Sequence, residues 1–475
     1  MLLRSFILRC SLPQHHKLHR VLLIRSLRVW EIKNDSSHTE YTDEINGQKG
    51  WRKMEPKWQL KIVKPSILSH FLPYGYPDSV STSYLSFITY SFIASVSSAT
   101  SMVLSTQALL LAIGVGSNHA PPIAGAFNWI LKDGIGQIGG VYFASKVSSS
   151  SLTIDSDPKR WRILSALALD GATMLETLCP LFPHYFLPLA SIANIGKNIG
   201  FLTASASRAS IHQALVKRDN LGDITAKAGS QSTAASLVGT SIGIILSPLL
   251  GNDTIHISLL VFTLSSIHIF YTCRSLRFVT LTTLNRSRLD LLLQEYFKNS
   301  TQIGTDHNQI RPESISQVES LWPFSFYYKD WLKVGCSLSE LCPDGIEQLT
   351  FLRDLLGADE KYIICPSWNH DTGIYSTGST CVKLTFFEDA TRRDILRGMT
   401  HAYALRVCIT NHPRHHNKRC YESEIITQSY NVMKMHFDKL ILTLANHGWN
   451  VEGSQCRVME GAAAVRLRID TKYEG

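Results

Sequence analysis

Charged residues are missing from long stretches in the middle of this 475-residue chain. No Asp, Glu, Lys or Arg occurs among the 53 residues of 79–131, the 25 residues of 228–252 or the 20 residues of 254–273. Since 18% of the whole chain is charged, gaps of this length are not expected in a protein whose surface faces water. We infer that the middle of the chain lies in an apolar solvent, and that the mean hydropathy of +0.01 averages over two environments.

Sequence signatures of catalysis are missing as well. The ten cysteines form no CxxC pair, so free buried thiols are expected rather than a zinc knuckle or a disulfide framework. Isolated Ser, His and Asp residues form no nucleophile elbow, and no lysine stands out as the Schiff-base partner of a pyridoxal-phosphate cofactor. Gly134, Gly136 and Gly139 follow no predicted strand, which argues against a nucleotide-binding turn. We therefore expect no enzymatic activity, no catalytic residue and no cofactor.

The residue types of a metal site gather in one hydrophilic segment. His412, His415, His416 and Cys420 could ligate zinc. Arg and Lys residues are interleaved with them, however, as in a solvated loop. We expect no metal ion here.

The net charge of +9 is concentrated at the N-terminus. The first 30 residues hold six Lys or Arg and no Asp or Glu, with apolar residues between the charges. This pattern is typical of an organellar transit peptide, so a mitochondrial or other organellar membrane is the expected location; a disordered basic tail is the alternative. The remaining excess of +3 shows no basic stripe interleaved with aromatic residues, which argues against a nucleic-acid partner.

Six apolar segments are long enough to cross a lipid bilayer, whose core of about 30 Å requires about 20 helical residues. They are 84–115, 123–145, 163–182, 185–205, 230–250 and 254–273. Buried helices of a soluble protein are the competing interpretation. The loops distinguish the two, because cationic loops stay preferentially on the cytoplasmic-type side of a membrane.

The charges of these loops alternate without exception. Four or more Lys or Arg residues precede the first segment, follow the second, follow the fourth and follow the sixth. The three intervening loops, 116–122, 183–184 and 251–253, contain none. The alternation predicts about six spans surrounded by membrane lipid, with both ends of the chain on the same, positively charged side.

The expected fold is mainly α: a polytopic transmembrane helical bundle followed by a small soluble α+β domain. In the soluble domain, 381–387 is rich in β-forming residues, and 391–409 and 429–447 have helical spacing. The second helix should stop at Gly448, before a predicted strand at 449–451. The expected domains are a basic, disordered leader at 1–60, a helical membrane domain at 61–284, a linker with short helices at 285–345 and the α+β domain at 346–475.

Five ionisable residues lie inside the predicted spans, where such residues are costly and often functional. They are Lys132, Asp133, Asp170, Glu176 and Lys197. Counting from the positive side at a helical rise of about 1.5 Å per residue places Lys132 level with Glu176, and Asp170 level with Lys197. We predict these two ion pairs, with Asp133 left near glycines. Pairing that makes burial tolerable is one interpretation, and a substrate or proton path is the other.

Small and hydroxylated residues recur at helical spacing in the same region. Five serines share one face of the first span: Ser91, Ser95, Ser98, Ser101 and Ser105. They predict either close helix packing with interhelical hydrogen bonds or the lining of a polar cavity. Three glycine pairs let helix backbones approach and favour a tight bundle: Gly136 and Gly140, Gly196 and Gly200, Gly239 and Gly243.

Several segments resemble the root UVB-sensitive family in their order and spacing. They are FLPYGYPDSVSTSYLSFITY (71–90), QALLLAIGVG through WILKDGIGQIGG (107–140), DPKRWRILSALALDGATMLETLCPLFP (157–183) and NLGDITAKAGSQST (220–233). Residues 382–405 resemble the family more loosely. The resemblance implies a membrane protein that, in plants, is associated with ultraviolet-B tolerance and with pyridoxal-phosphate homeostasis in plastids. It implies no enzymatic activity.

Four positions depart from the pattern that this resemblance implies. Ala228 and Ser232 stand where family members usually carry acidic residues. Ser165 and Ala166 replace a usual Ala-Asp pair. Any role that needs those carboxylates is put in question by these differences.

Two functions remain open. The first is a carrier or carrier-like protein that moves or senses a small polar metabolite, with a pyridoxal-related compound suggested by the resemblance alone. The second is a non-transporting membrane scaffold whose C-terminal domain binds a protein partner. A sealed bundle with every embedded charge paired favours the scaffold, whereas an aqueous cavity that reaches Asp133 or Lys132 favours the carrier.

Overall fold

The computed structural model describes most of the chain. The described residues are 28–32, 38–43, 51–54, 70–114, 122–149, 154–300, 307–322, 331–357, 359–366, 368–369, 374–375, 382–411, 418–451 and 466–468. The chain divides into two compact units, Met1–Ser69 and His70–Gly475.

The first unit contains a three-stranded antiparallel sheet. Its strands β1 (Arg28–Ile32), β2 (His38–Asp43) and β3 (Trp51–Met54) form a meander, in which Tyr41 of β2 pairs with Val29 on one side and Lys53 on the other. The aromatic and β-branched residues of these short segments favour extended backbone. We expected no regular structure in residues 1–60, and the three strands correct that expectation.

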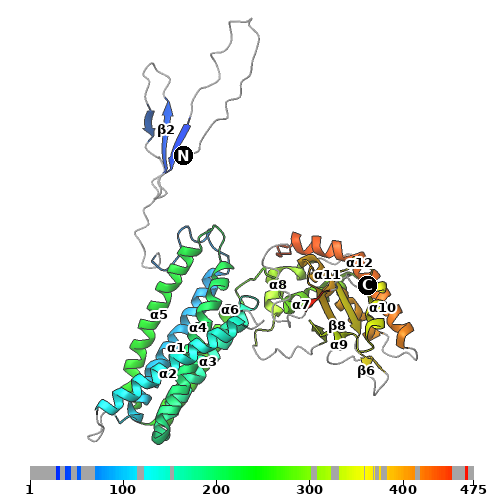
Figure 1. Cartoon of the computed structure of the whole chain (residues 1–475). Coiled ribbons are helices and arrows are strands. Elements are labelled where there is room, and N and C mark those ends of the chain that lie inside the picture. The colour runs from blue at the N-terminus through cyan, green and yellow to red at the C-terminus, as the bar shows by residue number, and fades with distance from the viewer. Residues whose placement is uncertain are drawn as a thin grey trace, which may run out of the picture. The chain divides into compact units, whose positions relative to one another are not determined.

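All six apolar segments of the second unit are helical (Figure 1). The helices are α1 (Tyr84–Ala112), α2 (Pro122–Ser149), α3 (Pro158–Leu178), α4 (Phe186–Gln213), α5 (Leu221–Leu250) and α6 (Thr254–Leu276). By length and composition, α1, α3, α5 and α6 are long and apolar enough to cross a membrane. Two short 3₁₀ helices, Cys179–Leu181 and Pro183–Tyr185, connect α3 to α4.

Local sequence signals set the ends of these helices. Pro158 occupies the first turn of α3, where the N–H that it lacks would have no helical partner. Gly251 follows α5 with a φ of +60°, a conformation that favours glycine. Two residues later the carboxylate of Asp253 accepts hydrogen bonds from the backbone N–H groups of Ile255 and His256 and caps α6.

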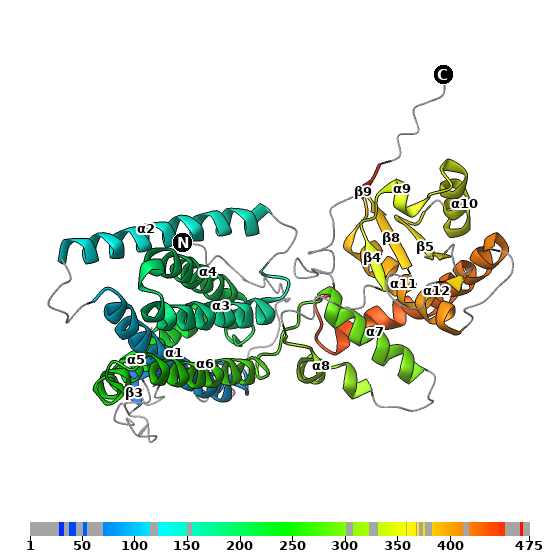
Figure 2. The ribbon, with the colours of Figure 1, turned by 90° about the horizontal axis from the view of Figure 1, so that it is seen from below.

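Helix α1 packs against α3, α5 and α6, and α3 packs against α4 and α6. Helix α2 lies along α4 on the outer side of the bundle (Figure 2). A methyl group on Gly239 would lie 2.5 Å from the carbonyl oxygen of Val96, so α5 and α1 touch through their backbones. The glycines of the three predicted pairs all lie where two helices approach: Gly136 and Gly140 against α4, Gly196 and Gly200 against α3, Gly239 and Gly243 against α1.

The outer surface of the bundle is apolar. In α5, only 17% of the most apolar 18-residue window is buried within the structure. Contiguous exposed apolar surface of this kind is typical of contact with lipid or with another protein. Large apolar side chains are exposed on four of the helices: Phe127, Ile138, Val141, Ile192, Phe201, Leu237, Ile245, Leu249, Leu259, Phe262 and Phe270.

The C-terminal part combines a small sheet with helices. The helices are α7 (Arg286–Ser300), α8 (Pro312–Val318), α9 (Leu338–Leu341), α10 (Ile346–Leu356), α11 (Arg392–Asn411) and α12 (Lys418–Asn446). Strand β8 (Val382–Phe387) lies between β4 (Leu332–Val334), to which it is parallel, and β5 (Tyr362–Pro366), to which it is antiparallel. Strand β9 (Arg466–Leu467) pairs with the end of β8, and β6 (Trp368–Asn369) pairs with β7 (Ile374–Tyr375).

The predicted elements of this part match the structure unevenly. Strand β8 and helix α11 lie within a residue or two of the predicted 381–387 and 391–409. Helix α12 begins about three turns before the predicted residue 429. The predicted strand at 449–451 is wrong: Asn450 makes only an isolated bridge to Thr283, and Trp449 is buried with its indole N–H donating to the Ile310 carbonyl at 2.7 Å. The segment is thus held by contacts with residues far earlier in the chain rather than by pairing in a sheet.

The predicted linker at 285–345 takes part in the C-terminal core. Four residues of α7 belong to the same buried cluster as Tyr362 of β5 and Phe386 of β8. These are Leu289, Leu292, Leu293 and Tyr296. The segment that follows the last helix of the bundle is therefore packed into the C-terminal part.

Candidate functional site

The five charged residues predicted inside the bundle all have polar partners, but the partners differ from the predicted ones. Lys197 of α4 forms an ion pair with Glu176 of α3, and both side chains are largely buried. The predicted pairs Lys132–Glu176 and Asp170–Lys197 are therefore wrong. The depth count failed because α3 and α4 extend beyond their apolar segments: Glu176 follows the first residue of α3 by 18 positions, and Lys197 precedes the last residue of α4 by 16.

Lys132 lies on the outer helix and pairs locally. Its Nζ is 2.5 Å from a carboxylate oxygen of Asp133 and 4.5 Å from the centre of the Trp129 ring. Asn194 of α4 donates to the same Asp133 oxygen at 3.0 Å and to the Lys132 carbonyl at 3.2 Å. Since α2 packs along α4, Lys132 faces α4 and does not pair with Glu176 of α3.

Asp170 is paired with a histidine. Nδ1 of His268 on α6 lies 2.9 and 2.8 Å from the two carboxylate oxygens of Asp170, and both side chains are buried. His268 was not predicted, because only Asp, Glu, Lys and Arg were counted as embedded charges. Histidine is ionisable near neutral pH and should have been counted among them.

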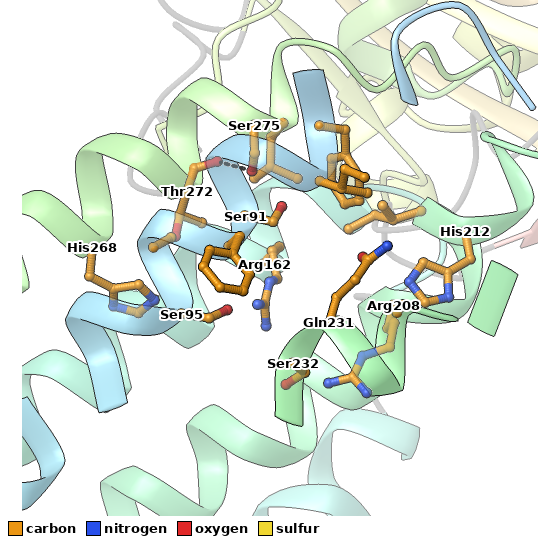
Figure 3. A pocket seen from close by; sticks show the side chains of 17 residues that line it. Ser91, Ser95, Arg162, Arg208, His212, Gln231, Ser232, His268, Thr272 and Ser275 are labelled. Carbon is orange, nitrogen blue, oxygen red and sulfur yellow. Dashed lines mark hydrogen bonds between the residues drawn. The ribbon is translucent and has the colours of Figure 1, made fainter. Parts of the chain in front are cut away.

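A cavity of about 110 Å³ lies between α1, α3, α4, α5 and α6 (Figure 3). Aromatic and aliphatic residues such as Phe87 and Phe92 form part of its wall. The described residues that line it include no carboxylate, and none of them comes from α2. The polar lining residues are Ser91, Ser95, Arg162, Arg208, His212, Gln231, Ser232, His268, Thr272 and Ser275.

Two arginines dominate the charge of this cavity. Arg162 is the fifth residue of α3, and Arg208 lies near the end of α4, so both approach the cavity from the positively charged side of the predicted topology. Their guanidinium groups are close enough to repel each other. Within the described part of the chain, neither has an ion-pair or hydrogen-bond partner. We refer to the cavity as the arginine pocket.

The serines predicted to share one face of α1 have two different roles: some line a cavity and others pack between helices. Ser91 and Ser95 line the arginine pocket. Ser101 and Ser105 are buried between helices, and their hydroxyls donate to the carbonyls of Ser97 and Met102 on α1 itself. The N-terminal part of the face therefore lines a cavity, and the C-terminal part packs between helices.

The arginine pocket was not predicted from the sequence. Arg162 and Arg208 were counted only as members of cationic loops, because each lies close to the end of its apolar segment. Two of the departures from the family pattern, Ala228 and Ser232, fall in the wall of this pocket. Ser165 lies instead at the contact of α3 with α4, beside Gly200.

Among the residues that the structure describes, the thiols and potential metal ligands form no further site. The six described cysteines are all free, and four of them are buried: Cys179, Cys336, Cys342 and Cys365. No group of three or more His, Cys, Asp or Glu residues in the described ranges is arranged to hold a metal ion. The side chains of His412, His415, His416 and Cys420 lie outside the described residues.

Comparison with known proteins assigns both parts of the chain. A family model described as the vitamin B6 photo-protection and homoeostasis domain matches residues 57–300. A second model, described as the C-terminal region of root UVB sensitive protein, matches residues 309–460. The two matches therefore separate just after α7. No solved structure is similar to the chain.

Curated relatives match over most of the chain. Protein root UVB sensitive 3 of Arabidopsis thaliana is 28% identical over 81% of this chain and 83% of its own length. Protein root UVB sensitive 2, chloroplastic, of the same plant is 29% identical over 88% and 90%. RUS family member 1 of Dictyostelium discoideum is 34% identical over 57% of this chain and 50% of its own length.

Proposed function

Because this chain belongs to the root UVB-sensitive family, and because its bundle combines an apolar exterior with a polar internal cavity, we propose that it is a multi-pass membrane protein that carries a small polar metabolite. We assign no chemical step to it. The basic leader that suggests an organellar membrane lies largely outside the described residues.

Six crossings are supported by three observations together. Four helices meet the length and composition of a span, and α2 and α4 have similar lengths of 28 residues each. The charges that make α2 and α4 more polar are neutralised by pairing of Lys132 with Asp133 and of Lys197 with Glu176. Pairing lowers the free energy of placing such groups in lipid. The alternation of loop charge then puts both ends of the bundle on one side.

The observation that carries the carrier proposal is the arginine pocket. A static scaffold gains nothing from two guanidinium groups that face one cavity without a described partner, Arg162 half-buried and Arg208 exposed, because like charges placed close together repel. A binding site gains selectivity from them. The pocket does not reach Lys132 or Asp133, so the path lies among α1, α3, α4, α5 and α6 rather than beside α2.

A pyridoxal-related compound is the first candidate for the cargo. The support is the description of the matching family model, which names vitamin B6 photo-protection and homoeostasis. The vitamers differ in whether they carry a phosphate group, so a panel with and without phosphate is informative about the site as well as about transport.

Uptake into vesicles tests the proposal. The full-length protein is reconstituted in liposomes, and uptake of labelled pyridoxine and pyridoxine phosphate is compared with empty liposomes. We expect protein-dependent, saturable uptake of at least one vitamer. Absence of uptake for the whole panel, in both directions of an imposed gradient, would reject the carrier.

A bulky substitution locates the path. Ser95→Phe adds a ring to the pocket wall and should abolish uptake. Ser241→Phe adds the same ring on the exposed face of α5 and should leave uptake within about twofold of wild type. Equal uptake by the two variants would place the path elsewhere.

A non-transporting scaffold is favoured by a different observation. All five charged residues predicted inside the spans are paired, which a sealed bundle requires of its embedded charges. The α+β part would then bind a protein partner. Crosslinking of the full-length protein in its native membrane, followed by recovery of the same partner in the absence of any uptake activity, would support this function over the carrier.

A further inference from the structure

We propose that the arginine pocket binds an oxyanion, the phosphate or carboxylate group of a small molecule, between Arg162 and Arg208. The inference deepens the carrier proposal, on which it rests for its physiological role, by naming the chemical class of the ligand. Binding itself can be measured without transport.

The charge balance of the pocket requires an anion. Arg162 and Arg208 repel each other across it, and no described lining residue is acidic. Asp170 is in contact with the lining residue His268, whose Nδ1 lies within 3 Å of both of its carboxylate oxygens. Two like charges that face one cavity repel each other, and an anion placed between them converts repulsion into two attractions.

The geometry suits an oxyanion better than a halide. A guanidinium presents a planar fork of N–H donors that matches two oxygens of a phosphate or carboxylate. In Figure 3 Arg162 and Arg208 approach the cavity from different helices, with Gln231 and Ser232 between them and Ser95 beside Arg162. The hydroxyls of Ser91 and Ser95 have no hydrogen-bond partner among the described residues and remain free to donate.

The size of the pocket limits the ligand. About 110 Å³ is below the roughly 300–1,000 Å³ of pockets that enclose drug-sized ligands. It accommodates one anionic group and a few attached atoms, and it excludes a nucleotide. The shared chemistry, an oxyanion on a small body, fits both a phosphate ester and a carboxylic acid.

Titration with inorganic phosphate tests the site. The full-length protein in lipid nanodiscs is titrated at constant ionic strength, and heat of binding and thermal midpoint are recorded. Sodium acetate is the second probe, because it offers a carboxylate of similar size. We expect saturable binding of at least one probe and a rise in the thermal midpoint. No saturable binding of either would overturn the inference.

Matched variants assign the binding to the two arginines. Arg162→Gln and Arg208→Gln should each weaken binding about ten- to a hundredfold, the range for losing a charged hydrogen bond. Arg218→Gln removes the same charge from the exposed loop after α4 and should leave binding unchanged. Equal weakening in all three variants would mean that only the general positive charge matters, which would also overturn the site.

A carboxylate introduced into the pocket provides a complementary test, because it should take the place of the bound anion. Ser232→Glu places an acid in the pocket wall, where it should pair with an arginine, abolish phosphate binding and raise the thermal midpoint of the ligand-free protein. A merely structural role for the arginines does not predict this rise. If Ser232→Glu binds phosphate as wild type does, the inference is wrong.

Failure of this inference can be told from failure of the carrier. Arginine-dependent phosphate binding without uptake of any vitamer would reject the carrier and keep the anion site. Uptake of a vitamer by a protein that shows no saturable binding of phosphate or acetate would reject the anion site and keep the carrier.

Discussion

Nζ of Lys159, in the first turn of α3, lies 3.3 Å from a carboxylate oxygen of Glu319, which follows α8. The other oxygen of Glu319 lies 2.9 Å from Nε of Arg288 in α7. All three side chains are almost completely buried. Lys159 also donates to the hydroxyl of Ser316 at 2.8 Å. One carboxylate thus connects the helix bundle with two helices of the C-terminal part.

Glu319 is expected to be a large single contributor to stability. Burial alone would raise the pKa of its carboxyl, but Arg288 and Lys159 outweigh burial and the pKa is lowered, so the group is charged. Glu319→Gln leaves two buried cations without their carboxylate and should lower the free energy of unfolding by about 3–5 kcal/mol. Thermal unfolding in detergent provides the measurement.

The control for this prediction is an exposed ion pair. Arg393 and Asp438 lie 2.7 Å apart with side chains 65% and 80% exposed. Asp438→Asn should change the free energy of unfolding by less than about 1 kcal/mol. Comparable losses for Asp438→Asn and Glu319→Gln would show that burial of the Glu319 cluster adds nothing.

His401 should make the C-terminal part sensitive to acid. Burial between Tyr362 and Ser429, each 3.1 Å from a ring nitrogen, lowers the pKa of His401 to about 3. Below a pH of about 6.5 the unfolded chain takes up this proton and the folded protein does not. Stability should therefore fall as pH falls through the window from 6.5 towards 3, by about 1.4 kcal/mol per pH unit from this group.

The variant His401→Gln tests the pH dependence. Glutamine keeps one donor and one acceptor for the two hydroxyls but does not titrate. Between pH 6.5 and 5 the Glu319 carboxyl stays ionised. In this range the free energy of unfolding should fall less steeply with falling pH in the variant, because the variant lacks the one proton that His401 takes up on unfolding. An unchanged slope would mean that His401 is protonated in the folded protein.

Gly239 should not tolerate a side chain. An added methyl group would lie 2.5 Å from the Val96 carbonyl oxygen and 2.7 Å from Ala99 Cβ, so α5 would have to move away from α1. The hydrogen bond from Thr100 Oγ1 to the Gly239 carbonyl, 3.0 Å long, would then be lost. Gly239→Ala should destabilise the bundle by about 1–3 kcal/mol, as overpacking does.

A glycine that faces open space is the matched control. A methyl group on Gly134 of α2 would meet nothing within 4 Å. Gly134→Ala should be neutral or stabilising by up to about 1 kcal/mol, because alanine has the higher helix propensity. Loss of stability in Gly134→Ala, with Gly239→Ala unaffected, would contradict the packing described here.

The helices of the bundle were predictable because charge is excluded from apolar surroundings over whole segments. Each of the six uncharged or nearly uncharged segments became a helix, and all but α1 extend to include flanking cationic residues. The extensions are where prediction failed. Lys159 and Arg160 look like loop residues in the sequence, yet they are buried in α3 by contacts with residues about 130 to 160 positions away. Contacts between residues so far apart in the chain cannot be predicted from the spacing of neighbouring residues in the sequence.

The candidate site illustrates the same limit. Depth along a helix can be counted from a sequence, but which neighbouring helix a residue faces depends on packing order. Lys197 was counted level with Asp170 but pairs with Glu176, because α4 continues to Gln213, beyond the predicted end of its span at residue 205. Asp170 instead faces α6, where His268 completes the pair. The arginine pocket combines five helices and has no sequence motif of its own.

The hydroxyl groups of α1 bear on how the protein is made. Ser97, Thr100 and Ser101 each donate to a carbonyl one turn earlier in their own helix. Their final neighbours α5 and α6 leave the ribosome more than a hundred residues later. During that interval α1 can wait in lipid with its hydroxyls already satisfied by its own backbone. The newly made helix therefore needs no chaperoning partner to hold its polar face, and assembly can proceed in the order of synthesis.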